Sequence, residues 1–187
     1  APSWEERRTR VARTIAEAGV DVVGLQEVTH QPTANAKTQY LDLQQLLRPA
    51  GFVAPAYTAE SDQCRWRAED PHPCTHTTGL LFRADTVEQV TLPDGSASAG
   101  TLPMGQVSAG MTVDAAPRKV VWAYLQGRSG SVAEGIGPFL AIVVHTSTLR
   151  DHANEAARIA FGQGLDDWVA GLNASHGMPG VPVVLMA

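Results

Sequence analysis

The chain has 187 residues, 44% of them hydrophobic, which is typical of one compact globular domain with a substantial core. Lys and Arg total 14 against 19 Asp and Glu, so the formal net charge is -5 and a broad basic surface for nucleic acid is not supported. No apolar run approaches the roughly 18 residues that a membrane-spanning helix needs, so we expect no membrane span.

The first predicted elements are a helix and a buried strand. Ser3-Trp4-Glu5-Glu6 is a capping-box pattern followed by apolar residues at helical spacing, which predicts a helix over residues 4–18 that ends at Gly19. This segment mixes Arg with Glu, which indicates a solvated helix face rather than a basic channel. Residues 20–28 form a Val-rich, nearly continuous apolar run, which predicts a buried strand with a polar end.

A second helix is predicted over residues 38–47, where Leu supplies the apolar side and Pro49 and Gly51 follow. Strands are predicted over residues 52–57, 79–83 and 87–92. Between the first two lies the long polar stretch 59–78, and long connections of this kind are more often functional or disordered than neutral spacers.

The remaining elements are expected after a long loop. Residues 93–117 are rich in Gly, Ala, Ser and Pro, which predicts that loop. Strands over residues 119–126 and 138–145, joined by a Gly-rich turn, suggest an antiparallel pair. A helix over residues 151–172 and a strand over residues 181–186 follow, so the order predicts a mixed α/β fold with antiparallel character.

Two cysteines, Cys64 and Cys74, lie close together in a polar stretch that contains Pro. A local disulfide is the favoured interpretation. Two free thiols, or a zinc site that includes His72 and His76, are the alternatives. Because disulfides persist in oxidising compartments, we expect a secreted or periplasmic protein.

Glu27 and His145 are the main candidates for chemistry. Glu27 ends the first predicted strand, where a carboxylate is costly unless it is paired or binds a cation such as Mg²⁺. The alternative is that Glu27 simply emerges into solvent. His145 ends an apolar strand, where an imidazole can donate to a phosphoryl oxygen or transfer a proton, and a purely structural histidine is the alternative.

Three further residues are weaker candidates for binding substrate. Arg83 and Arg150 each follow a strand, where a guanidinium could clamp a phosphate with two hydrogen bonds. His76 lies beside the strand that ends at Arg83. Solvated side chains are the simpler interpretation for all three.

Three motifs occur in order along the chain. Residues 21–28 read Asp-Val-Val-Gly-Leu-Gln-Glu-Val, and residues 79–83 read Gly-Leu-Leu-Phe-Arg. A strand that ends at His145 then precedes a helix and the run Pro-Val-Val-Leu at residues 182–185. In these motifs the chain resembles the endonuclease/exonuclease/phosphatase superfamily, also called deoxyribonuclease-like.

The resemblance implies a two-sheet α/β sandwich with mixed, largely antiparallel strands and flanking helices. It also implies metal-dependent hydrolysis of phosphate esters, of the phosphodiesterase, nuclease or phosphatase type. Glu27 would bind Mg²⁺, with Mn²⁺ or Ca²⁺ as alternatives, and His145 would be the catalytic residue that contacts the scissile phosphate. The substrate would be nucleic acid, a phospholipid head group or a small phosphodiester.

The chain also departs from the family pattern. The family's first strand with its metal-site Asn, its Gly-Asp-x-Asn motif and its late Asp-His pair do not occur here, and Thr146 stands where the family has Leu. We therefore expect a single domain that lacks its first strand and its C-terminal part, and that is inactive alone. The alternative function is a non-catalytic binding or assembly module that keeps this fold.

Overall fold

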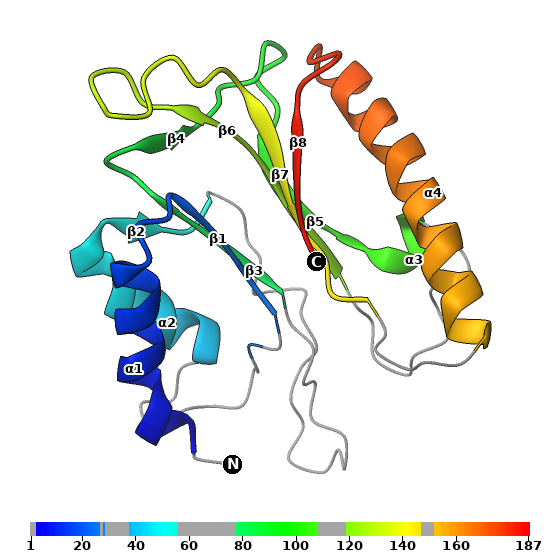
Figure 1. The fold of residues 1–187 in the computed structure, drawn as a ribbon. Coiled ribbons are helices and arrows are strands. Elements are labelled where there is room, and N and C mark those ends of the chain that lie inside the picture. The colour runs from blue at the N-terminus through cyan, green and yellow to red at the C-terminus, as the bar shows by residue number, and fades with distance from the viewer. Residues whose placement is uncertain (1–2, 27, 29–37, 56–77, 108–118, 147–151) are drawn as a thin grey trace.

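The computed structural model describes residues 3–26, 28, 38–55, 78–107, 119–146 and 152–187. These ranges form two β-sheets packed face to face, with helices on the outer face of each sheet (Figure 1). The two-sheet α/β sandwich predicted from the sequence is therefore confirmed.

The first sheet has three antiparallel strands in the order β1-β3-β2. β1 spans Val22–Leu25, β3 spans Gly79–Arg83 and β2 spans Phe52–Val53. The register pairs Leu25 with Gly79, so the end of β1 lies beside the start of β3. Because side chains alternate along a strand, Leu81 packs with the helices while Leu80 and Phe82 face the second sheet.

Two helices cover the outer face of this sheet, α1 (Trp4–Glu17) and α2 (Gln39–Leu47). The predicted capping box at Ser3 is present, and Gly19 follows the helix with a φ of +66°. Thr38 caps α2, so both predicted helices are confirmed. The carboxylate of Asp42, 3% exposed, joins the helices by accepting from Trp4 Nε1 at 2.8 Å and Arg8 at 2.7 Å. A 3₁₀ turn, η1 (Arg48–Ala50), then leads to β2.

The second sheet has the strand order β4-β6-β7-β8, with β5 paired to β6 beside this path. The strands are β4 (Val87–Gln89), β5 (Ala99–Pro103), β6 (Lys119–Gly127), β7 (Phe139–Val143) and β8 (Val183–Met186). The pair β7 and β8 is parallel, and the other pairs in this sheet are antiparallel. The antiparallel pair predicted for the two central strands is therefore confirmed.

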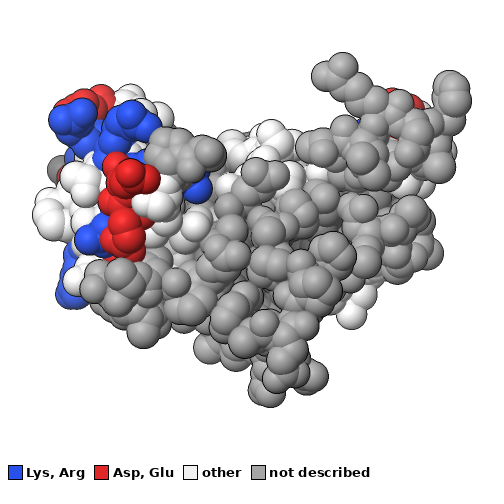
Figure 2. All heavy atoms as spheres, turned by 90° about the horizontal axis from the view of Figure 1, so that it is seen from below, with Lys and Arg blue, Asp and Glu red and all other residues white. Residues whose placement is uncertain are grey.

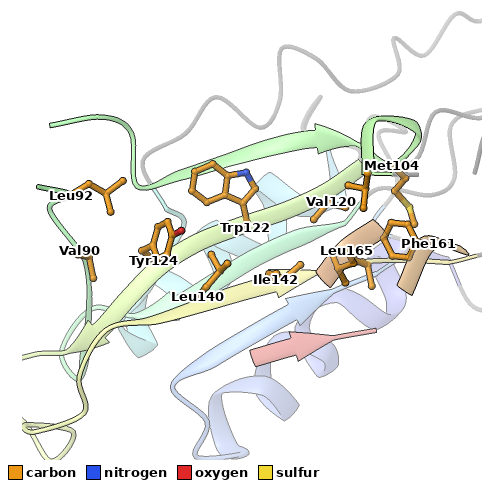
Figure 3. Close-up of a cluster of buried hydrophobic side chains, with 12 residues drawn as sticks. Val90, Leu92, Met104, Val120, Trp122, Tyr124, Leu140, Ile142, Phe161 and Leu165 are labelled. Atoms are coloured by element: carbon orange, nitrogen blue, oxygen red, sulfur yellow. The ribbon is translucent and has the colours of Figure 1, made fainter. Parts of the chain in front are cut away.

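The outer face of the second sheet packs against α4 (His152–Ser175) and the short helix α3 (Met104–Val107). Figure 3 shows side chains of both central strands and of α4 in this core, among them Trp122, Tyr124, Leu140, Phe161 and Leu165. The buried hydroxyl of Tyr124 donates to Asn173 Oδ1 at 2.6 Å, and burial raises the pKa of Tyr124 to about 12. This bond ties the centre of the sheet to the last turns of α4.

The prediction that residues 93–117 form a loop was wrong in part, because residues 99–107 form β5 and α3. β5 contains Gly100 and Pro103, which are poor strand formers. A Cβ on Gly100 would lie 2.9 Å from Trp122 Cζ2, so this glycine lets β5 approach the indole ring. Packing against β6 therefore decides the conformation here, and local propensity does not.

The two cysteines, Cys64 and Cys74, lie outside the described residues. Their disulfide, and the secreted localisation inferred from it, stay predictions. Within the described ranges, no helix combines the length and apolar character that crossing a membrane requires.

Candidate active site

The ends of β1 and β7 meet where the two sheets pack together. A Cβ on Gly24 of β1 would lie 3.2 Å from Val143 Cγ2 and 2.9 Å from Met186 Cβ. The backbone N–H of Val144 donates to the carbonyl of Met186 at 3.0 Å, which extends the pairing of β7 with β8 beyond Val143. The two sheets therefore bring the ends of β1, β7 and β8 to one place.

His145 lies just past this pairing and is 6% exposed. The side chains before it, from β7 and Val144, are buried on both faces. Ile142 and Val144 pack toward α4, and Ala141 and Val143 pack toward the first sheet. The imidazole therefore follows a strand that packing holds rigidly, in a setting with little water. Hydrogen bonds to a charged group are stronger in such a setting than in bulk water.

Gln26 connects the two strand ends directly. Its Nε2 donates to the carbonyl oxygen of Val144 at 2.9 Å, although the two residues lie far apart in the sequence and in different sheets. The sequence analysis did not single out Gln26. The available signal was alternation, because Gln26 follows Gly24 by two residues and thus faces the second sheet as Gly24 does.

Tyr40 of α2 supports the start of β3 next to the end of β1. Its hydroxyl donates to the carbonyl of Leu80 at 2.9 Å, and a Cβ on Gly79 would lie 2.4 Å from Tyr40 Cε2. The ring therefore fills the space that a side chain at position 79 would need. Because Gly79 pairs with Leu25, this packing also holds the end of β1.

Of the other residues predicted to bind metal or substrate, the structure describes Arg83, and it does not lie next to His145. Glu27, His76 and Arg150 lie outside the described residues. Arg83 lies beside the start of β1, where its N–H donates to the Asp21 carbonyl at 2.8 Å, so the antiparallel register sets it at the end of β1 opposite to Gln26. This placement does not support a role for Arg83 in binding substrate next to His145.

Arg83 instead pairs with a neighbouring carboxylate. Its guanidinium donates to Asp85 Oδ2 at 2.9 Å, and this hydrogen bond is the main cause that lowers the pKa of Asp85. The pair is local and partly exposed, so it contributes little to stability. The Arg83 side chain is thus partly buried and paired, and is not the solvated side chain of the simpler interpretation.

Charges of both signs lie on the described part of the end of the molecule toward which β7 runs. Figure 2 views this end from below Figure 1, and basic groups lie beside acidic groups on the side of α1 and α2. Arg8 illustrates the mixing, since it pairs with Glu5 at 3.0 Å and Asp42 at 2.7 Å. The described residues on this face therefore form no broad basic surface.

A metal site that the protein alone completes has several donor side chains close together, whereas a Mg²⁺ site that also uses water and substrate phosphate can have a single carboxylate. The described ranges contain no group of three or more His, Cys, Asp or Glu side chains suited to a metal ion. The carboxylate that the sequence assigns to the metal, Glu27, lies outside those ranges. The metal therefore stays a prediction from the sequence.

Comparisons with known proteins find matches among solved structures. No family model matches the chain, and neither does any curated protein. An endonuclease/exonuclease/phosphatase family protein from Bacteroides thetaiotaomicron has a TM-score of 0.63 and 16% identity, covering 98% of this chain and 54% of its own. The human Nocturnin catalytic domain has a TM-score of 0.64 and 18% identity, covering 99% of this chain and 57% of its own.

A third similar structure, the endonuclease/exonuclease/phosphatase from Beutenbergia cavernae, has a TM-score of 0.55 and 15% identity, covering 85% of this chain and 38% of its own. The chain thus spans about half the length, or less, of these solved structures. At such identities the likeness concerns the fold alone. The chain has the fold of the endonuclease/exonuclease/phosphatase proteins, as its three sequence motifs predicted.

Proposed function

We propose that this chain is part of a metal-dependent hydrolase of phosphate esters, of the phosphodiesterase, nuclease or phosphatase type. In this proposal Glu27 binds Mg²⁺ and His145 contacts the phosphate that is cleaved. The observation that carries it is the 2.9 Å hydrogen bond from Gln26 to the Val144 carbonyl, because it joins the residues that directly precede Glu27 and His145.

The chemistry of these two residue types suits a phosphate ester. An imidazole can donate a hydrogen bond to a phosphoryl oxygen and stabilise the negative charge that develops there, and this effect is larger where water is scarce. His145 is 6% exposed and follows a rigid strand, so little reorganisation is needed when it meets a phosphate.

A divalent metal is the expected cofactor. Mg²⁺ is commonly held by one or two carboxylates together with water and substrate phosphate, so Glu27 alone would suffice as the protein anchor. The metal would supply charge neutralisation and a more acidic bound water. Mn²⁺ and Ca²⁺ have similar ligand preferences and are the alternatives.

The similar structures support an anion as ligand. The human Nocturnin catalytic domain was solved with a bound sulfate anion, which is tetrahedral like phosphate. Since a fold alone does not determine function, this support is secondary to the residues at the strand ends. The net charge of -5 favours a small phosphodiester or a lipid head group over nucleic acid as substrate.

The test is hydrolysis of bis-(p-nitrophenyl) phosphate with Mg²⁺ or Mn²⁺ by the protein at its full natural length. Glu27→Gln and His145→Gln should each lower kcat/KM by at least about 100-fold, as expected for groups that act on the developing charge. The matched controls are Glu17→Gln, exposed at the end of α1, and His176→Gln, which follows the end of α4.

Both control variants should keep the native rate. Metal-dependent turnover that is unchanged in Glu27→Gln would overturn the metal assignment, and unchanged turnover in His145→Gln would overturn the catalytic one. A natural-length protein that binds a phosphodiester without hydrolysing it would favour the non-catalytic alternative.

A further inference from the structure

Gln26 makes a contact that crosses from one sheet to the other. Its side-chain amide donates to the backbone carbonyl of Val144 at 2.9 Å, over a separation of 118 residues in the chain. The Gln26 side chain is otherwise exposed, so the stability gained from this single bond is small. The main consequence of this bond is therefore the geometry that it fixes, and not the stability that it adds.

The neighbouring contacts hold the donor and the acceptor of this bond in place. Gly24 allows β1 to approach β7 and β8, since a Cβ there would lie within 3.2 Å of Val143 and Met186 atoms. Val144 uses its N–H to pair with the Met186 carbonyl at 3.0 Å, and its carbonyl accepts from Gln26. Both backbone polar groups of Val144 are therefore held, one by β8 and one by the residue after β1.

The bond acts on the backbone just before His145. Fixing the carbonyl of Val144 fixes the peptide plane that joins Val144 to His145, because peptide groups are planar. On the other strand, Gln26 is the residue before Glu27. One side chain thus links the peptide that carries the histidine to the segment that carries the carboxylate.

We propose that Gln26 is a positioning residue that sets the separation and orientation of His145 relative to the end of β1. This inference rests on the proposed function for its catalytic consequence. Its structural content, that loss of the amide changes the environment of His145, does not depend on that function.

The decisive variant is Gln26→Met, which keeps the length of the side chain and removes the donor. In the natural-length protein with Mg²⁺, kcat for phosphodiester hydrolysis should fall by about 10- to 100-fold, as for other groups that orient a reacting residue, with a smaller change in KM. The ring ¹H and ¹³C signals of His145, assigned by their loss in His145→Gln, should also shift.

The matched control is Gln126→Met. Gln126 Nε2 donates to Glu88 Oε1, also at 2.9 Å, but this bond lies within the second sheet. Both variants lose one amide hydrogen bond, so they should melt at similar temperatures, while Gln126→Met keeps the native kcat and the native His145 signals.

Each outcome decides the proposal. If Gln26→Met leaves the His145 signals in place, or if Gln126→Met lowers kcat by the same factor, the positioning role is overturned. If the native protein proves inactive on every phosphodiester, the proposed function fails, yet a selective shift of the His145 signals in Gln26→Met still supports the positioning role.

Discussion

Replacing Gly24 with Ala tests the close approach of the two sheets at the candidate site. The added Cβ would lie 2.9 Å from Met186 Cβ, 3.0 Å from Met186 Sδ and 3.2 Å from Val143 Cγ2. Carbon atoms in favourable contact lie about 3.5–4.0 Å apart. The Met186 sulfur can rotate away, but its Cβ cannot, so β1 has to move relative to β8.

The expected cost follows from two opposing effects. Forcing an extra carbon into a packed interior costs about 1–3 kcal/mol. Ala in place of Gly returns about 0.5–1 kcal/mol, because Gly loses more backbone freedom on folding. The middle of each range gives a net loss of about 1 kcal/mol, which lowers Tm by about 2–4 °C in a domain of this size.

The measurement is urea and thermal unfolding of Gly24→Ala beside Gly171→Ala. A Cβ on Gly171, which is exposed on α4, meets no atom within 4 Å, so that variant should gain about 0.5–1 kcal/mol. Gly24→Ala should also shift the His145 ring signals, since moving β1 disturbs the bond from Gln26. A Gly24→Ala protein as stable as the native one, with the expected gain in Gly171→Ala, would refute the close approach.

Tyr124→Phe should lower the free energy of unfolding by about 1–3 kcal/mol, because it leaves the buried Oδ1 of Asn173 without its donor. Adding Asn173→Leu to Tyr124→Phe should recover part of this loss. Urea unfolding of the single and the double variant measures both effects, and a Tyr124→Phe protein as stable as the native one would contradict the prediction. The pKa of Asp94 is lowered from 3.8 to about 2, chiefly by the Ser96 hydroxyl, so its stabilising effect is present above pH 3.8 and is lost as the pH falls toward 2. When the pH is lowered from 3.8 to 2, the Tm should therefore fall less in Asp94→Asn than in the native protein. In the exposed control Asp166→Asn, the Tm should fall as much as in the native protein.

Much of the fold was predictable because its signals are local. The capping box at Ser3, and Gly19 and Gly51 as stop signals, act within a few residues, and the two helices that they helped to predict are present. The two central strands of the second sheet are continuous apolar runs, which need no knowledge of their neighbours. Their antiparallel pairing followed from the turn between them.

β5 was missed for the opposite reason. Its residues have low strand propensity, and the segment becomes a strand because β6 offers unpaired backbone groups and Trp122 has a face that only a glycine can approach. Neither partner is visible from the composition of the segment itself.

Arg83 shows a limit of reasoning from strand ends. The sequence places it after a strand, as it places Glu27 and His145, but it does not state the direction in which each strand runs. β1 and β3 are antiparallel, with Val22 opposite Phe82, so Arg83, the last residue of β3, lies beside the start of β1. The C-terminal ends of two neighbouring antiparallel strands lie at opposite edges of a sheet. The register of β1 with β3 is therefore needed to see that Arg83 lies away from the end of β1 where the candidate site is.

The same reasoning explains why the sequence singled out His145 as a candidate and did not single out Gln26. A histidine after an apolar run is conspicuous, because its side chain has chemistry of its own. A glutamine at a strand end is ordinary until its acceptor is known, and that acceptor is a backbone carbonyl 118 residues away in the other sheet. The position of Gln26 two residues after Gly24 nevertheless carries information. A glycine that permits close approach fixes which face of β1 meets the second sheet, and the next side chain on that face is the one able to reach across.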